Sequence, residues 1–158
     1  MLEAVRVGKF WNLSWEEFER DTRILAKKLL SLQKKWTGII SVTRGGLVPA
    51  AIVAEEMNIR NIETVSVIGY SPDDNNPEIM AEAKIVKAAH VGDGEGWLVI
   101  DDLVDTGRTV EMLRKVMPKA YFATVYAKPE GVRFADTYAG DVAQDIWIQF
   151  PWALIEKK

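Results

Sequence analysis

Three carboxylates follow an apolar run in VIDDLVDTG, residues 99–107. Asp101 and Asp102 are adjacent, and Asp105 comes three positions after Asp102, directly before Thr106 and Gly107. Like charges crowded at the end of a strand cost free energy, because each disfavours ionisation of the next. Such a cluster can accept hydrogen bonds from ligand hydroxyls, bind Mg²⁺ or remove a proton. We therefore treat it as the candidate chemical centre of the chain.

The residues that follow the acids favour phosphate binding. Residues 105–109 (DTGRT) lie where an apolar strand passes into a helix, and helix starts offer free N–H groups and partial positive charge. Gly107 lets the backbone approach an anion, and Thr106 and Thr109 add hydroxyl donors. Helix capping beside solvated acids is the ordinary explanation of an isolated acidic pair, but it explains the whole pattern poorly. A ribose phosphate that carries a pyrophosphate and Mg²⁺ accounts for the acids as well.

A second candidate anion site is the turn TRGG, residues 43–46. Arg44 can make charge-assisted bonds, and Gly45 and Gly46 free the backbone to turn toward an anion. Taken alone, this turn is equally well an ordinary tight turn. Its position at the end of a second predicted strand favours a contact with pyrophosphate.

The order of predicted elements indicates an α/β fold. Ser14 and Glu17 form a capping-box pattern, and apolar residues then recur at helical spacing. The predicted elements are a helix at 15–34, a strand at 36–42, a helix at 48–57, a strand at 64–69, a strand at 97–100, a helix at 109–117 and a strand at 120–127. Alternating strands and helices predict a mostly parallel sheet, in which ligands bind beyond the carboxyl ends of the strands. Both unusual turns fall at such ends.

Composition narrows the class of protein. The 158 residues are enough for one domain, and the absence of cysteine excludes disulfides and thiolate chemistry. A single histidine, His90, argues against a histidine-based metal site or triad. The net charge of −3 gives no reason to expect nucleic acid as a partner. Because we find neither a signal-peptide core nor a run of about 20 apolar residues, we expect a soluble intracellular protein without an integral membrane segment.

VIDDLVDTGRT resembles the phosphoribosyl pyrophosphate (PRPP) signature of the type I phosphoribosyltransferases. Four segments in order, SVTRGGLVPAAIVAEEMNIR, GDGEGWLVIDDLVDTG, ATVYAKPEG and QDIWIQFPW, resemble the bacterial xanthine-guanine phosphoribosyltransferases, and the resemblance covers most of residues 14–152. It implies the type I phosphoribosyltransferase fold, with a mostly parallel central sheet flanked by helices and a small hood. The expected single domain spans 1–158, with its core at about 14–128, a mobile loop at about 70–96 and a purine-recognising hood at about 129–158.

The resemblance implies a purine salvage reaction. A phosphoribosyl group would pass from PRPP to N9 of xanthine, guanine or, less well, hypoxanthine, with Mg²⁺ as cofactor and pyrophosphate as the second product. It also implies a homotetramer or dimer, located in the cytoplasm or peripherally on the inner face of the cell membrane. Two alternatives stay open: a PRPP- or nucleotide-binding regulatory protein on the same fold, and a phosphoribosyltransferase for another base.

The resemblance also assigns roles to residues. Asp101 and Asp102 would meet the ribose hydroxyls and Mg²⁺, with Asp102 as the metal contact, and Asp105 would be the catalytic proton acceptor beside the purine N7. The residues implied for PRPP and ribose binding are Arg44, Gly45, Asp101, Asp102, Asp105, Thr106, Gly107, Arg108 and Thr109.

The purine site is implied beside Asp105. Lys128 would donate to the purine O6, which favours 6-oxopurines over adenine. Trp147 would stack on the base, a contact worth about 1–3 kcal/mol by analogy with nucleic-acid stacking, and Ile148 would offer its backbone carbonyl. Without the resemblance, Lys128 reads as a solvated strand-end lysine and Trp147 equally well as a core residue.

The chain departs from the family pattern at several positions, two of which bear on the site. Ala81 stands near the position of a frequent loop arginine, and Ala153 follows Trp152 where an acid is common. Lys84 and Lys87 could meet the pyrophosphate instead, or they could belong to a solvated helix face.

Overall fold

The computed structural model describes residues 6–7, 9–70 and 82–153. In chain order its elements are β1 (Arg6–Val7), β2 (Phe10–Asn12), α1 (Trp15–Ser31), β3 (Gly38–Thr43), α2 (Leu47–Met57), β4 (Ile62–Tyr70), β5 (Glu82–Lys87), β6 (Trp97–Val104), α3 (Arg108–Val116), β7 (Tyr121–Ala127), the 3₁₀ turn η1 (Val132–Phe134), β8 (Thr137–Asp141) and β9 (Trp147–Gln149). Among these described elements, no helix combines the length and the apolar character needed to cross a membrane.

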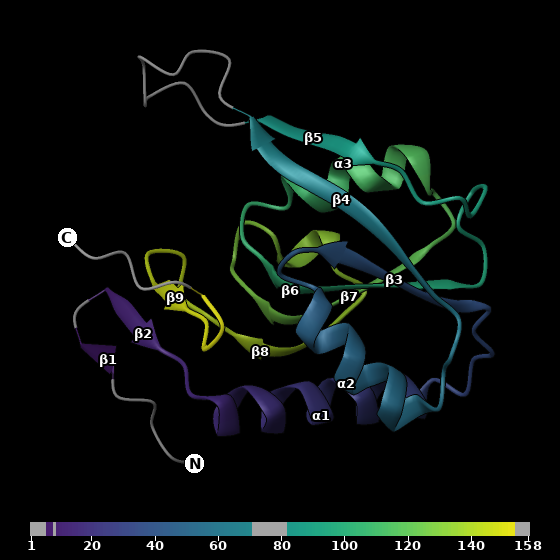
Figure 1. Ribbon diagram of the computed structural model, residues 1–158. Helices are drawn as coiled ribbons and strands as arrows, with labels where there is room; N and C mark the ends of the chain where they lie inside the picture. Colours follow the sequence, from purple (N-terminus) through teal and green to yellow (C-terminus); the bar gives the residue numbers. More distant parts are fainter. Residues whose placement is uncertain (1–5, 8, 71–81, 154–158) are drawn as a thin grey trace.

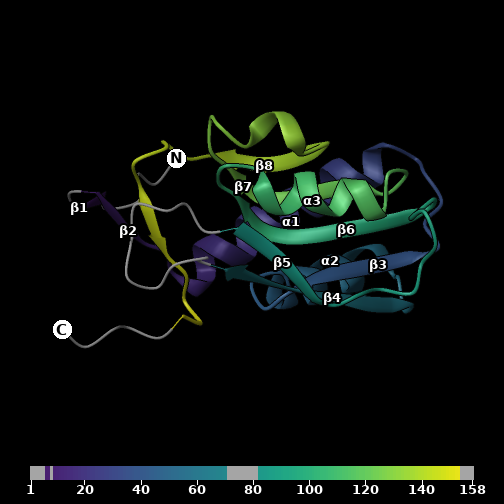
Figure 2. The same cartoon turned by 90° about the horizontal axis from the view of Figure 1, so that it is seen from above.

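A six-stranded sheet in the order β5-β4-β3-β6-β7-β8 forms the centre of the molecule. All its neighbouring strands run parallel except β4 and β5, which are antiparallel. Helices α1 and α2 lie on one face and α3 lies on the other (Figures 1 and 2). The prediction of a mostly parallel sheet flanked by helices is therefore confirmed.

A three-stranded sheet in the order β1-β2-β9 joins the two ends of the described chain. It lies to one side of the large sheet (Figure 1). We call this small sheet the hood. Strand β8 lies within the range 129–158 that we expected for the hood, but it pairs with β7 in the large sheet. The described hood thus takes one strand from the C-terminal region and two from the N-terminal end.

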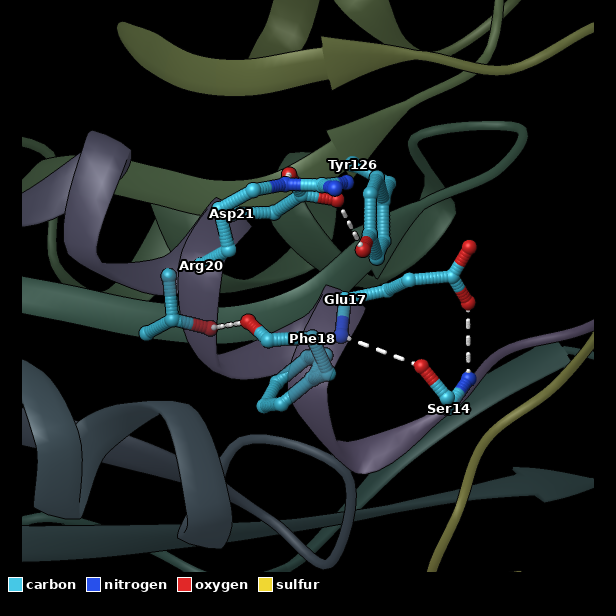
Figure 3. A network of polar contacts seen from close by, with 7 residues as sticks. Ser14, Glu17, Phe18, Arg20, Asp21 and Tyr126 are labelled. Atoms are coloured by element: carbon cyan, nitrogen blue, oxygen red, sulfur yellow. Dashed lines mark hydrogen bonds and ion pairs between the residues drawn. The ribbon is translucent and has the colours of Figure 1, made fainter. Parts of the chain in front are cut away.

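Helix α1 begins as its sequence predicts. The Ser14 hydroxyl accepts from the Glu17 N–H at 3.1 Å, and the Ser14 N–H donates to the Glu17 carboxylate at 2.9 Å (Figure 3). Its apolar stripe, which includes Phe18, Leu25 and Leu29, is fully buried against the sheet. The helix ends at Ser31, slightly before the predicted end.

Both faces of the large sheet are apolar. Phe18, Ile39 and Tyr126 belong to the cluster under α1 and α2, whereas Ile40 and Phe122 belong to the cluster under α3. Strands buried on both faces need continuous apolar runs, which explains sequences such as GIISV and YFATVYA.

The polar segment 70–96 contains regular structure that its sequence did not reveal. Strand β5 pairs antiparallel with β4 and is the edge strand of the large sheet. Lys84 and Lys87 therefore lie on a strand, and the alternative that placed them on a helix face is wrong. Residues 71–81, which include Ala81 and part of the expected mobile loop, lie outside the described residues.

Candidate functional site

Strand β6 continues through the acidic pair instead of ending before it. The pairing of β3 with β6 stops at Ser41 and Ile100, whereas the pairing of β6 with β7 continues to Val104 and Ala127. Aspartate is unfavourable in strands, so the pairing with β7 overrides local preference here. Asp101 and Asp102 consequently lie just beyond the point where the pairing with β3 ends.

The turn at residues 43–46 packs directly on this acidic strand end. A Cβ atom at Gly45 would lie 2.5 Å from the Asp102 carboxylate, and one at Gly46 would lie 2.5 Å from the Ile100 carbonyl oxygen. Larger residues are excluded at both positions because the approach is so close. Gly45 and Gly46 of the TRGG turn therefore allow the turn to pack against β6. The peptide bond between Thr43 and Arg44 is cis.

A cavity of about 620 Å³ lies between these segments. It is lined by the end of β3 and the following turn, by β4 and β5, by the acidic pair and by the start of α3. The lining residues are Val42, Thr43, Arg44, Gly45, Val67, Ile68, Gly69, Ala83, Asp101, Asp102, Thr106, Arg108 and Thr109. The two turns that the sequence singled out thus share one cavity.

The start of α3 has the geometry of an anion site. Gly107 is the N-cap with φ of +88°, a left-handed conformation that favours glycine. It has no side chain to occupy the first N–H groups of the helix, so these can meet a phosphate. The ring of Phe134, which sequence analysis did not single out, lies against the place that a Cβ at Gly107 would take.

The acidic pair resists ionisation in the ligand-free protein. Burial raises the pKa of Asp101 well above its ordinary value, and the neighbouring charge of Asp102 raises it further. Burial also raises the pKa of Asp102. The Asp102 N–H donates to the Asp101 carboxylate at 2.8 Å, which is the bond that orients the first acid. A bound cation would favour the ionised pair.

Two carboxylates fit Mg²⁺ better than a metal that needs an all-protein site. In the part of the chain that the structure describes, no group of three or more metal-ligating side chains occurs. Mg²⁺ is commonly held by one or two carboxylates together with substrate phosphates and water. Asp101 and Asp102, which line the cavity, meet that requirement.

Asp105 and Lys128 form a second polar unit beside the cavity. The Lys128 Nζ lies 3.2 Å from the Asp105 Oδ2, and the lysine side chain is 5% exposed whereas the aspartate side chain is 50% exposed. The alternative of a solvated strand-end lysine is therefore wrong. Buried ammonium groups need a partner, and Asp105 supplies it.

The hood carries the remaining predicted residues. Trp147 is 64% exposed, so it is not a core residue, whereas the Ile148 side chain is buried. The Trp147 N–H donates to Lys9 and the Gln149 carbonyl accepts from Leu13, both bonds being made toward β2. Because successive residues of a strand point their backbone groups to opposite sides, the Ile148 carbonyl faces the other edge of β9, which carries no strand in the described sheet.

One contact to Asp105 was not foreseen. Gln144, in the connection between β8 and β9, donates from Nε2 to the Asp105 Oδ1 at 2.7 Å. Gln144 is the first residue of the segment QDIWIQFPW, but nothing local in that segment indicates that its side chain meets Asp105. Only the fold shows that it meets Asp105, which lies 39 positions earlier in the chain.

Comparison with known proteins identifies close relatives. The phosphoribosyl transferase domain matches residues 13–156. The xanthine-guanine phosphoribosyltransferase of Gluconobacter oxydans is 48% identical over 141 residues, which cover 89% of this chain and 82% of that protein. The enzyme of the same name from Desulfotalea psychrophila is 51% identical over 140 residues, covering 89% and 84%. A solved purine phosphoribosyltransferase from Pyrococcus horikoshii has a TM-score of 0.75 at 26% identity, covering 95% of this chain and 100% of that one.

Proposed function

The chain belongs to the phosphoribosyltransferase family, and we propose that it transfers the 5-phosphoribosyl group from PRPP to N9 of a 6-oxopurine in purine salvage. The products are a nucleoside monophosphate (XMP, GMP or IMP) and pyrophosphate. The observation that carries the proposal is the shared cavity, in which the Arg44 turn, the acidic pair and the start of α3 meet. Its volume of about 620 Å³ suits a ligand of the size of PRPP.

The sugar phosphate end of PRPP fits the acidic side of the cavity. The N–H groups at the start of α3, with Thr106 and Thr109, would hold the 5′-phosphate. Asp101 and Asp102 would accept from the ribose hydroxyls and hold Mg²⁺, with Asp102 as the direct contact. Mg²⁺, when bound, neutralises charge on the departing pyrophosphate. Arg44 in the opposite turn would bind the same leaving group.

The reaction breaks the bond between C1′ and the pyrophosphate oxygen and forms the bond between C1′ and N9. Positive charge develops on the sugar ring as pyrophosphate leaves, and the nearby carboxylates stabilise it. The purine loses one proton overall, and we assign its acceptance at N7 to Asp105. The half-exposed Asp105 side chain is open enough to reach a base at the cavity edge.

Selectivity for 6-oxopurines is assigned to Lys128. Its ammonium can donate to O6 but offers no acceptor for the 6-amino group of adenine. Trp147 would stack on the base, and the edge-facing carbonyl of Ile148 would accept from the group at C2. The stated order of bases, a homotetrameric assembly and a cytoplasmic location are further proposals, which rest on the family resemblance.

Steady-state assays test the proposal with guanine, xanthine, hypoxanthine, adenine and orotate, each with PRPP and Mg²⁺. We expect turnover with guanine and xanthine, slower turnover with hypoxanthine and none with adenine or orotate. PRPP binding without turnover of any base would support the regulatory alternative instead. In a Lys128→Ala variant, we expect the preference for oxopurines over adenine to fall by about tenfold or more. Intact rejection of adenine by that variant would place selectivity elsewhere.

A further inference from the structure

Both carboxylate oxygens of Asp105 are held by donors from other parts of the chain. Oδ1 accepts from the Gln144 side chain at 2.7 Å, and Oδ2 lies 3.2 Å from the Lys128 Nζ. Lys128 follows β7, whereas Gln144 comes from the connection to the hood. Two donors on opposite oxygens restrict rotation of the carboxylate more than either one does alone.

The orientation of the Gln144 amide is determined by its second partner. The Glu130 backbone N–H donates to the Gln144 Oε1 at 3.0 Å. An N–H group pairs only with the oxygen end of the amide, so the NH₂ end must face Asp105. A glutamine is therefore matched to this place, because it accepts at one end and donates at the other.

The backbone that holds Gln144 is itself packed on Asp105. A Cβ atom at Gly131 would lie 2.6 Å from the Asp105 backbone oxygen, so the turn after β7 approaches the acid closely. Within that turn the Gly131 N–H donates to the Lys128 carbonyl at 3.0 Å. The Glu130 N–H thus has a defined position relative to Asp105. Because this N–H donates to Gln144, it also fixes the place of the Gln144 amide.

We infer that Gln144 is a positioning residue that holds Asp105 toward the purine during phosphoribosyl transfer. The inference rests on the proposed function and concerns a residue to which no role has been given above. Lys128 would divide its three donors between Asp105 and the purine O6. Gln144 has no such second task, and it keeps the proton acceptor oriented while Lys128 is engaged with the base.

A Gln144→Glu variant tests this role, because the glutamate side chain has almost the same size and shape as the glutamine side chain. The new carboxylate can still accept from the Glu130 N–H, but it cannot donate to Asp105 when ionised. With guanine at pH 8 we expect kcat to fall about tenfold, because a hydrogen bond to a charged group is lost and a repulsion is added. The KM for PRPP should change less than about twofold, and Tm should stay within about 2 °C.

The pH dependence separates positioning from a general structural effect. The charged groups that face position 144 are Asp105 and, across it, Lys128. As pH falls toward 5, the introduced carboxyl of Gln144→Glu takes up a proton and can donate again, so its deficit relative to the wild type should shrink. Gln144→Leu can donate at no pH, and its deficit should stay constant.

Gln149→Glu is the matched control, because it adds the same charge within the hood but its amide bonds the Ala153 carbonyl, not Asp105. We expect its deficit to be small and independent of pH. Unchanged kcat in Gln144→Glu, or equal pH-independent losses in Gln144→Glu and Gln144→Leu, would overturn the positioning role. Wild-type protein that turns over no purine would instead contradict the proposed function.

Discussion

The neighbouring strands β7 and β6 differ in whether their polar side chains are paired within the protein. On β7, Tyr126 is fully buried, and its hydroxyl donates to the Asp21 carboxylate of α1 at 2.7 Å (Figure 3). Arg20 lies 3.1 Å from the other oxygen of the same carboxylate. Burial, followed by the bond to Asp21, raises the pKa of Tyr126, so the hydroxyl stays a donor. Every group of this network has a protein partner.

On β6, the adjacent strand, burial and the charge of Asp102 raise the pKa of Asp101. Asp101 pairs in register with Thr124, only two residues from Tyr126, yet its carboxylate receives no cation from the described protein. The raised pKa values of both acids report the cost of burying them together. Polar groups that are paired within the protein contribute to stability, whereas we assign the acids, which have no cation among the described residues, to the binding of Mg²⁺ and substrate.

The largest expected effect comes from Asp105→Asn. The amide keeps the size of the side chain but cannot accept a proton, so kcat should fall about 100-fold or more while the dissociation constant of GMP changes only about threefold. Turnover assays and calorimetric titration with GMP measure the two quantities. Unchanged turnover would remove Asp105 from its role as proton acceptor.

Asp101→Asn should separate function from stability. We expect kcat/KM for PRPP to fall about tenfold, because the amide accepts hydrogen bonds from the ribose hydroxyls less strongly than the carboxylate does. The ligand-free protein should nevertheless gain about 2–4 °C in Tm, because a costly buried carboxylate is removed. Thermal unfolding with and without PRPP and Mg²⁺ measures the change, and the ligand should stabilise the wild type more than the variant.

The sign of the pH dependence follows from the raised pKa of Asp101. A carboxyl whose pKa is raised by folding contributes its stability below the unfolded value of 3.8 and loses it as pH rises through the folded value. The Tm advantage of Asp101→Asn should therefore be small near pH 4 and should grow toward pH 8. An advantage that is largest in acid would contradict the burial cost.

Tyr126→Phe tests the matched network on β7. Loss of the hydroxyl leaves Asp21 with one partner fewer, and the free energy of unfolding should fall by about 1–1.5 kcal/mol. Because the network does not touch the cavity, kcat with guanine should stay within about twofold of the wild type. Denaturant unfolding and the standard assay measure the two effects, and a large loss of kcat would show that the two regions are coupled.

The smallest effect is expected for Ser14→Ala. This change removes the acceptor for the Glu17 N–H and half of the capping box, which should cost about 0.5–1 kcal/mol of stability. Activity and the KM for PRPP should not change. Denaturant unfolding measures the loss, and Ser14→Asp, which keeps an acceptor, should restore most of it.

Local signals in the sequence account for the parts that were predicted correctly. The capping pattern at Ser14 and Glu17 predicted the start of α1, and the change from apolar strand to DTGRT predicted the start of α3 within one residue. The clustering of both glycine turns in one cavity also followed, because parallel strands bring their carboxyl ends to one edge. Strand β6 was predicted too short, since its continuation through the acids depends on pairing with β7.

The α/β class, the alternation of elements, the acidic strand end and the helix start at Gly107 could all be predicted from the amino-acid sequence. Those features depend on patterns among residues that are only a few positions apart in the chain. The folded structure was needed to show that β5 is an edge strand of the large sheet, that β8 joins the same sheet and that Lys128 is buried. It alone brought Gln144 to Asp105, because a contact between distant residues depends on how the elements pack and leaves no local pattern in the sequence.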